Sequence, residues 1–240
     1  MGHVLDSPAP LSARAQAFLA EHADRVAVDT GPDDDRCRAE MRAVLGYCDE
    51  QALSALRWVQ QRYSGLTYRS PLRGKIVFEP VLEVDTGTGR IEFWYAIMDE
   101  RPDGVSSGSL LPDGTLLFGL FDVDLPAFPS LDHFIECDAL LNFANRQELL
   151  STERPERVTS HMAELRRRHP SLRRLERESG SLVEWWSDGE LLVFQSSLDA
   201  ELTARVPDMN RARAVVQTWH LVSPLACATT ASTAPPTAQA

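Results

Sequence analysis

Lysine is almost absent from this chain. Its 240 residues include 24 basic residues, and Lys75 is the only lysine among them. The 35 acidic residues outnumber the basic ones and leave a formal net charge of −11. Because an acidic protein repels phosphate and gains little from counterion release, this charge makes nucleic acid an unlikely partner.

Long hydrophobic runs are also missing. No apolar run approaches the roughly 18 residues that are typical of a membrane-spanning helix. The opening stretch, MGHVLDSPAP, has neither the basic start nor the apolar segment of about 7 to 15 residues that a secretory signal needs. We therefore expect no membrane partner and a cytoplasmic location. A hydrophobic content of 43% still allows a sizeable core.

The four cysteines form no CxxC pair; they are Cys37, Cys48, Cys137 and Cys227. In a chain of this length, such spacing predicts reduced thiols rather than a disulfide framework. On one helix, the first two would lie about 16 Å apart, too far for a disulfide. Cys137 falls in the middle of an expected helix, on its apolar side, where a thiol is usually inert.

Common catalytic signatures are missing too: there is no G-x-S-x-G elbow, no P-loop and no HExxH. Two Asp-Thr-Gly triplets, at 29–31 and 85–87, are the pattern that an aspartic peptidase would carry. That chemistry needs two carboxylates about 3 Å apart, each from a lobe of on the order of 100 residues. The aspartates are only 56 positions apart (85 − 29). We therefore interpret Asp85 as a solvent-exposed turn residue of a hairpin, and the first triplet as a loop.

Two His-x-x-Glu pairs each place an imidazole and a carboxylate on one helix face; they are His133 with Glu136 and His161 with Glu164. No third ligand follows at a recognisable spacing. We predict no catalytic residue, no metal and no cofactor. A hydrolase or metal-dependent enzyme that uses Asp85 or these pairs stays open as the alternative.

Periodicity predicts helices in the first quarter of the chain and strands after it. The first helix covers 11–26 with a cap at Ser7, and a second helical stretch breaks near Gly46 and restarts behind Asp49. It ends at 64–65, where glycine suits a helix C-terminus. Strands are expected at 75–84, 90–98 and 114–123, joined by glycine-containing turns.

The second half is expected to alternate helices with a hairpin. A helix capped by Ser130 should bury Leu131, Phe134, Ile135, Leu140, Leu141 and Phe143. An arginine-rich helix pair is predicted at 158–178, with a break at Pro170. Asp188-Gly189 predicts a hairpin turn, Asp208 caps a closing helix, and the Ala/Thr/Pro-rich end should be disordered.

These elements predict an α+β fold, a mostly antiparallel sheet packed against helices, with a C-terminal helix-hairpin-helix extension. The expected organisation is an N-terminal helix in 1–30, an α+β core in 31–150, an α/β extension in 151–221 packed on that core, and a disordered tail in 222–240.

Four stretches between 51 and 145 carry a family resemblance: LRWVQQRYSGLTY, DTGTGRIEFWY, LPDGTLLFG and FPSLDHFIECDAL. Their order resembles the SUKH superfamily of immunity-type proteins. Ile135, Glu136, Asp138, Ala139 and Leu140 match the helix pattern of that family. Ser64-Gly65-Leu66 departs from its double-glycine turn.

The resemblance implies an α+β sheet on helices and a non-enzymatic role. Members of the family bind and neutralise toxins, often nucleases, in bacterial competition, and others are partners in cell-wall signalling. No catalytic residues are carried over. The segment 151–220 falls outside the resemblance and leaves a further role open.

Charge is unevenly distributed along the chain. Residues 75–145 contain thirteen acidic and three basic residues, a balance of −10, whereas 146–178 contain nine arginines and six acids, a balance of +3. The residues expected to bind a partner are Glu79, Glu83, Glu92, Asp99, Glu100, Asp122 and Asp124. We expect a cytoplasmic protein-binding domain, in one form an immunity protein that covers a basic toxin with this acidic surface. A structural partner in a larger complex, docking through the arginines of 158–178, is the other alternative.

Overall fold

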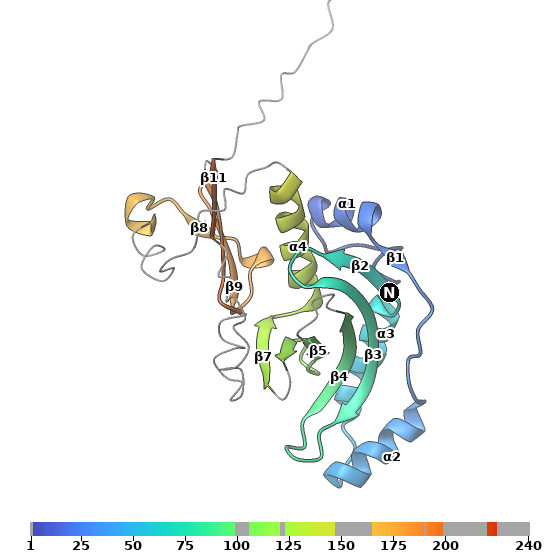
Figure 1. The fold of residues 1–240 in the computed structure, drawn as a ribbon. Coiled ribbons are helices and arrows are strands. Elements are labelled where there is room, and N and C mark those ends of the chain that lie inside the picture. The colour runs from blue at the N-terminus through green and yellow to red at the C-terminus, as the bar shows by residue number, and fades with distance from the viewer. Residues whose placement is uncertain are drawn as a thin grey trace, which may run out of the picture.

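The computed structural model describes residues 2–98, 106–120, 123–146, 165–189, 191–198 and 220–224 (Figure 1). Within them, the chain forms a seven-stranded and a four-stranded sheet, both antiparallel, together with helices. The predicted α+β class, with an antiparallel sheet packed on helices, is confirmed.

The larger sheet follows the order of the sequence, and each strand pairs with the next one along the chain. Its strands are β1 (Asp24–Arg25), β2 (Leu66–Ser70), β3 (Gly74–Val84), β4 (Ile91–Met98), β5 (Ser106–Leu110), β6 (Leu116–Leu120) and β7 (Val123–Phe128). The register of β3 and β4 shifts between Val77 and Val81, and this irregularity accommodates Pro80, which has no N–H to donate.

The predicted strands correspond to β3, β4 and β6, but β5 was not expected. Its sequence, SSGSL, lacks the β-branched and aromatic residues that indicate a strand. Gly108 of β5 is required by packing, because a Cβ there would lie 2.4 Å from the hydroxyl oxygen of Tyr95 on β4.

The helices α1 (Ala13–His22), α2 (Asp34–Leu45), α3 (Glu50–Tyr63) and α4 (Leu131–Arg146) lie close to their expected places. Asp49 caps α3 as predicted, by accepting the N–H of Ala52 at 2.9 Å. The cap predicted at Ser7 is wrong, because the Ser12 hydroxyl accepts the N–H of Ala15 and α1 begins there. Gly46 ends α2 in the left-handed conformation.

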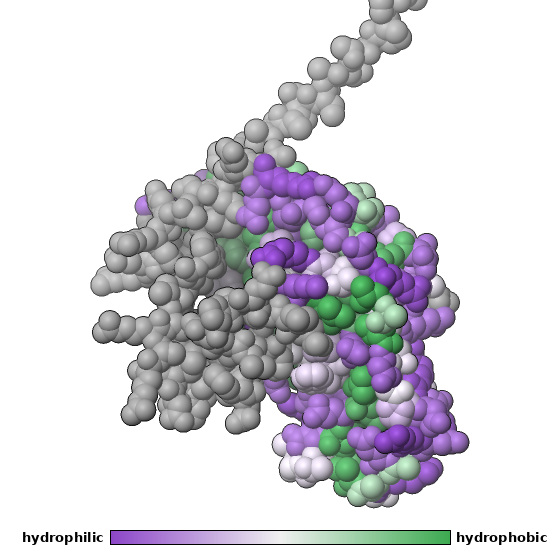
Figure 2. Space-filling model, turned by 45° about the vertical axis from the view of Figure 1, so that its right-hand side comes forward, coloured by the Kyte–Doolittle hydropathy of each residue, from purple (hydrophilic) through white to green (hydrophobic). Residues whose placement is uncertain are grey.

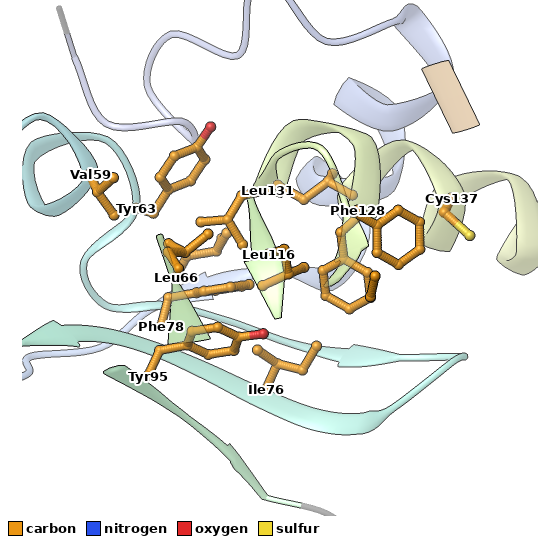
Figure 3. Close-up of a cluster of buried hydrophobic side chains, with 14 of the residues drawn as sticks. Val59, Tyr63, Leu66, Ile76, Phe78, Tyr95, Leu116, Phe128, Leu131 and Cys137 are labelled. Atoms are coloured by element: carbon orange, nitrogen blue, oxygen red, sulfur yellow. The ribbon is translucent and has the colours of Figure 1, made fainter. Parts of the chain in front are cut away.

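One hydrophobic core joins the helices to the larger sheet (Figure 3). The ring centroids of Phe78 on β3 and Tyr95 on β4 are 5.1 Å apart. Those of Phe134 on α4 and Phe118 on β6 are 5.3 Å apart. The predicted buried face of α4 is correct except at Phe143, which is 38% exposed.

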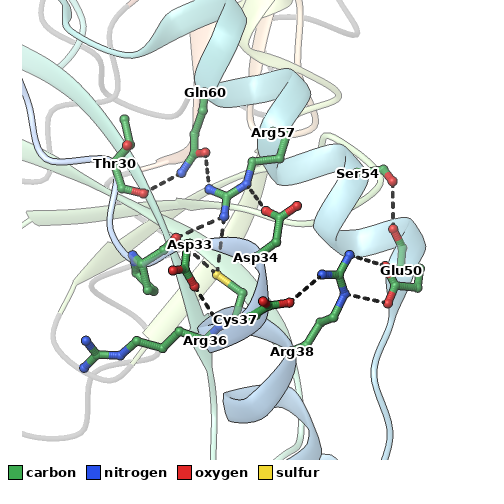
Figure 4. A network of polar contacts seen from close by, with 12 residues as sticks. Thr30, Asp33, Asp34, Arg36, Cys37, Arg38, Glu50, Ser54, Arg57 and Gln60 are labelled. Carbon is green, nitrogen blue, oxygen red and sulfur yellow. Dashed lines mark hydrogen bonds and ion pairs between the residues drawn. The ribbon is translucent and has the colours of Figure 1, made fainter.

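A polar network fixes the loop before α2 against α3 and β3 (Figure 4). The guanidinium of Arg57 donates to Asp34 at 2.6 Å, to Gln60 at 2.6 Å and to the Pro32 carbonyl at 3.0 Å. The amide of Gln60 donates in turn to the Pro80 carbonyl at 2.8 Å. Because Arg57 satisfies the Pro32 carbonyl and pairs with Asp34, the loop that contains the first Asp-Thr-Gly triplet is held against α3.

The smaller sheet consists of β8 (Arg173–Arg174), β9 (Val183–Ser187), β10 (Leu191–Ser196) and β11 (His220–Pro224), with η1 (Glu176–Glu178) beside it. Figure 1 shows α4 between this sheet and α1. The indole N–H of Trp185 donates to the Cys137 sulfur on α4 at 3.3 Å, so the buried thiol that the sequence predicts serves as an acceptor. The hairpin predicted at Asp188-Gly189 is present between β9 and β10.

Two predictions for the second half are wrong where the structure describes them. Residues 165–168 of the predicted helix pair are helical, but Arg173–Arg174 form β8, because they pair with β9, and Glu176–Glu178 form only the short 3-10 helix η1. Residues 222–224, predicted to be disordered, belong to β11 and pair with β10. The predicted helix at 208–220 lies outside the described residues except for its last residue, which begins β11, and 158–164 also lie outside them.

Hydrophilic residues cover most of the described surface visible in Figure 2, and hydrophobic patches interrupt them. Among the described residues, the large hydrophobic side chains that are exposed are Val26, Val44, Tyr47, Trp58, Trp94 and Phe143. Trp94 lies on the larger sheet, beside the charged residues described next.

Candidate functional site

The polar face of β4 carries the acidic residues that the sequence singled out. Side chains alternate along a strand, so that Phe93 and Tyr95 enter the core while Glu92 and Trp94 lie on the opposite face. Glu83 of β3 stands directly across from Glu92. Like charges opposite one another on a sheet repel, and a compensating group is needed.

Arg90 supplies that compensation. Its Nε donates to the carboxylate of Glu92, and its Nη2 donates to Oδ2 of Asp124 on β7 at 3.1 Å. The hydroxyl of Ser109 on β5 donates to the other oxygen of Glu92. We call Glu83, Glu92 and Asp124, with Arg90 and Ser109, the acidic cluster. It connects β4 to β5 and β7.

The acidic cluster contains more negative than positive charge. Partial desolvation raises the pKa of Glu83, and the charges of Glu92, Asp85 and Asp124 raise it further. Desolvation, followed by the charge of Glu92, also raises the pKa of Asp124, although Arg90 opposes this. One guanidinium therefore does not neutralise these carboxylates, and a further cation placed near them would be stabilised.

Trp94 adds an aromatic surface to the same face. Its side chain is 47% exposed, and its strand neighbours are Val81 on β3 and Ser109 on β5. An exposed indole can pack against the alkyl stem of an arginine or lysine and attract its charge through the ring face. The combination of carboxylates and an indole suits a basic side chain.

The structure brings together three of the seven acidic residues that were expected to bind a partner: Glu83, Glu92 and Asp124. Glu92 is 7% exposed, so it acts through Arg90 instead of forming a surface contact. Glu79 lies apart, where its Oε1 accepts the N–H of Asp29 at 3.2 Å. The others, Asp99, Glu100 and Asp122, lie outside the described residues.

Sequence reasoning missed Arg90, Ser109 and Trp94. The period-2 alternation of RIEFWY places Arg90, Glu92 and Trp94 on one face, so this signal was present for two of the three. Ser109 had no such signal, because its strand was not predicted.

Asp85 is a turn residue, as predicted, but it is half-buried instead of fully solvent-exposed. Its Oδ1 accepts the N–H groups of Gly87 at 2.7 Å and Thr88 at 3.1 Å, and these bonds lower its pKa. Asp29 makes the same kind of turn, with its Oδ1 accepting the Gly31 N–H at 2.8 Å. Each carboxylate is thus bound to its own loop, an arrangement unlike the shared proton of an aspartic peptidase dyad.

Glu136 of the first His-x-x-Glu pair serves as an anchor between helices. It is 1% exposed, and its carboxylate accepts both the N–H and the hydroxyl of Ser12 at the start of α1. His133 instead faces the Ser130 hydroxyl at 2.8 Å. No group of three or more His, Cys, Asp or Glu side chains that could hold a metal occurs among the described residues. His161 and Glu164 lie outside them.

Several arginines of the basic segment already make contacts within the chain. Arg174 donates to Glu184 at 3.0 Å and to the Gly180 carbonyl. Arg177 donates to the Pro10 carbonyl at 3.1 Å. The guanidinium carbon of Arg166 lies 4.8 Å from the centroid of the Trp186 ring. The Arg174 and Arg166 contacts support the smaller sheet, and that of Arg177 joins η1 to the segment before α1, so that all three reduce the basic surface left for a partner.

Comparison with protein-family models, with curated proteins and with solved structures yields no match for this chain. Over the part of the chain that the structure describes, none of the helices has both the length and the apolar character needed to cross a membrane.

Proposed function

We propose that the chain is a non-enzymatic protein-binding module that covers a basic partner with the acidic cluster and Trp94. The observation that carries this proposal is the imbalance of charge on one sheet face: among the described residues, Arg90 pairs with Glu92 and Asp124, while Glu83 stands across from Glu92 with its pKa raised by desolvation and by neighbouring carboxylates. A partner arginine or lysine would supply the missing cation.

An immunity role gives this binding its purpose. Proteins that bind phosphate, such as nuclease toxins, are basic at their active surface, and an acidic inhibitor associates with such a surface quickly. The resemblance of 51–145 to the SUKH superfamily supports the same proposal. In this proposed role, the module binds its toxin in the bacterial cytoplasm and blocks the toxin surface that would bind nucleic acid.

The proposal is tested by co-expression with the proteins encoded beside its gene. Protection of growth and recovery of a stable complex are the expected results for one of them. If no neighbouring gene product is bound and none is rendered harmless, the immunity role is wrong.

The binding face is tested with the charge reversal Glu83→Lys and the matched control Asp35→Lys. Asp35 lies on α2, and its side chain is 97% exposed, so both variants change the charge by the same amount. We expect Glu83→Lys to slow association about 10-fold or more at low salt, with a much smaller effect of Asp35→Lys. Equal effects of the two variants would show that net charge, rather than this face, governs binding.

The enzymatic alternative receives no support from the geometry of Asp85 or Glu136, because both carboxylates are bound within the chain. Substituting Asp85→Asn is expected to weaken the hairpin turn and to leave any partner binding unchanged.

A further inference from the structure

A second carboxylate cluster lies inside the core, on the helical side of the larger sheet. Asp138 of α4 is completely buried. Its Oδ2 accepts the hydroxyl of Tyr68 at 3.0 Å, and its Oδ1 accepts the hydroxyl of Ser70 at 2.8 Å. Both hydroxyls come from β2, so Asp138 joins α4 to the β2–β3 hairpin.

The Ser70 hydroxyl has a fixed orientation. Its oxygen accepts the N–H of Leu72 at 3.1 Å and the N–H of Arg73 at 3.0 Å, within the turn that leads to β3. A hydroxyl oxygen has two lone pairs, and both are used by these bonds. Its hydrogen must therefore point to Asp138, which makes Oδ1 an obligatory acceptor.

Proton uptake by Asp138 can then take place only at Oδ2. That oxygen faces the Tyr68 hydroxyl, which donates to it when the carboxyl is ionised. Once Oδ2 carries a proton, the phenol oxygen becomes the acceptor and the Tyr68 hydrogen turns away. The two protonation states of Asp138 thus differ in the direction of one hydrogen bond.

Few other groups near Asp138 change charge around neutral pH. Tyr68 of β2, Tyr95 of β4 and Cys137 of α4 face the same interior, and burial raises the pKa of each well above its usual range. They stay neutral there. Arg73, from the β2–β3 turn, is buried with its guanidinium 4.8 Å from the Phe118 ring centroid, and an arginine keeps its charge at every relevant pH.

We propose that Asp138, Tyr68 and Ser70 form a proton-linked clamp between α4 and the β2–β3 hairpin, which holds more tightly when Oδ2 is protonated. The physical reason is that an ionised carboxylate in the core loses its hydration and gains only hydroxyl and amide donors in return.

The direction of the pH dependence follows from the pKa of Asp138. Burial raises it to about 7, and the hydrogen bonds from Ser70 and Tyr68 oppose the rise. The folded pKa lies above the unfolded value near 3.8. Hence the stabilisation is complete below the ordinary Asp range and is lost as the pH rises through about 7.

Thermal unfolding of the full chain between about pH 5 and about pH 8 tests the clamp. We expect the Tm of the wild type to fall by about 5 to 10 °C more over this range than that of Asp138→Asn, whose amide imitates the protonated acid. Asp132→Asn is the matched control, because Asp132 also lies on α4 and accepts a tyrosine hydroxyl, that of Tyr63 at 2.8 Å. It should keep the pH dependence of the wild type. Identical pH dependence in the wild type and Asp138→Asn would overturn the proposal.

A second measurement needs no change at Asp138. The side-chain carboxyl ¹³C resonance of Asp138 is followed by NMR against pH in the wild type and in Tyr68→Phe. Titration near neutral pH, with a midpoint that rises in Tyr68→Phe because a donor to Oδ2 is lost, supports the clamp. Titration in the ordinary range of an aspartate, or a midpoint unmoved by the loss of the Tyr68 hydroxyl, contradicts it.

Discussion

The two faces of the larger sheet each hold a carboxylate cluster, and they are compensated differently. On the polar face, Glu92 is paired with the guanidinium of Arg90 and the hydroxyl of Ser109. On the helical face, Asp138 instead accepts the hydroxyls of Tyr68 and Ser70. A cation such as Arg90 neutralises the negative charge of a carboxylate, whereas hydroxyls only donate hydrogen bonds to it. Burial therefore favours the protonated form of Asp138.

The largest expected effect in this comparison comes from Ser70→Ala. It removes a donor to Asp138 and leaves the N–H groups of Leu72 and Arg73 without their acceptor. We expect a loss of about 2 to 3 kcal/mol in the free energy of unfolding. Chemical denaturation at two pH values measures it, and the loss should be greater at the higher pH, where Asp138 is ionised. Equal losses would indicate that Asp138 is in the same protonation state at both.

Glu92→Ala is expected to have a smaller effect. Although Glu92 is buried, Arg90 is 41% exposed and keeps Asp124 as a partner, so no charge is left stranded in the interior. A loss of about 1 to 2 kcal/mol is expected, with little change between the two pH values. Glu92→Gln keeps an acceptor for Ser109 and should recover part of it. A loss as large as that of Ser70→Ala would mean that Arg90 depends on Glu92 alone.

Asp124→Asn should change stability least, by less than about 1 kcal/mol, because its partner Arg90 is substantially exposed to solvent. Its effect should instead be seen in titration. Removing this negative charge lowers the pKa of Glu83, one of whose raising causes is Asp124. NMR titration of the Glu83 carboxyl measures the shift, and an unchanged midpoint would mean that the two carboxylates do not act as one cluster.

Local patterns in the sequence predict much of the fold. The caps at Asp49 and Ser130, the hairpin at Asp188-Gly189 and the alternation in β3 and β4 depend on neighbouring residues, and all are present. The Ser-Gly-rich β5 and the edge strand β11 were not predicted. Each is a strand because a neighbouring strand pairs with it, and its own residues do not indicate this pairing.

The candidate site could be predicted only in part. The acidic character of 75–124 is visible in the sequence, and so is the shared face of Arg90 and Glu92. The bond from Arg90 to Asp124 joins residues 34 positions apart, and that from Tyr68 to Asp138 joins residues 70 apart. Such pairs depend on how the sheet and α4 pack, which periodicity does not specify.

The sequential order of the seven strands has a consequence for how the chain folds. Each strand from β2 to β7 pairs with its immediate predecessor in the sequence, so the sheet can grow hairpin by hairpin with little loop-closure entropy at each step. In contrast, β10 ends at Ser196 and its partner β11 starts only at His220, so that this pairing closes a longer connection. We expect the larger sheet to acquire hydrogen-exchange protection early in refolding and the β10–β11 edge to acquire it last.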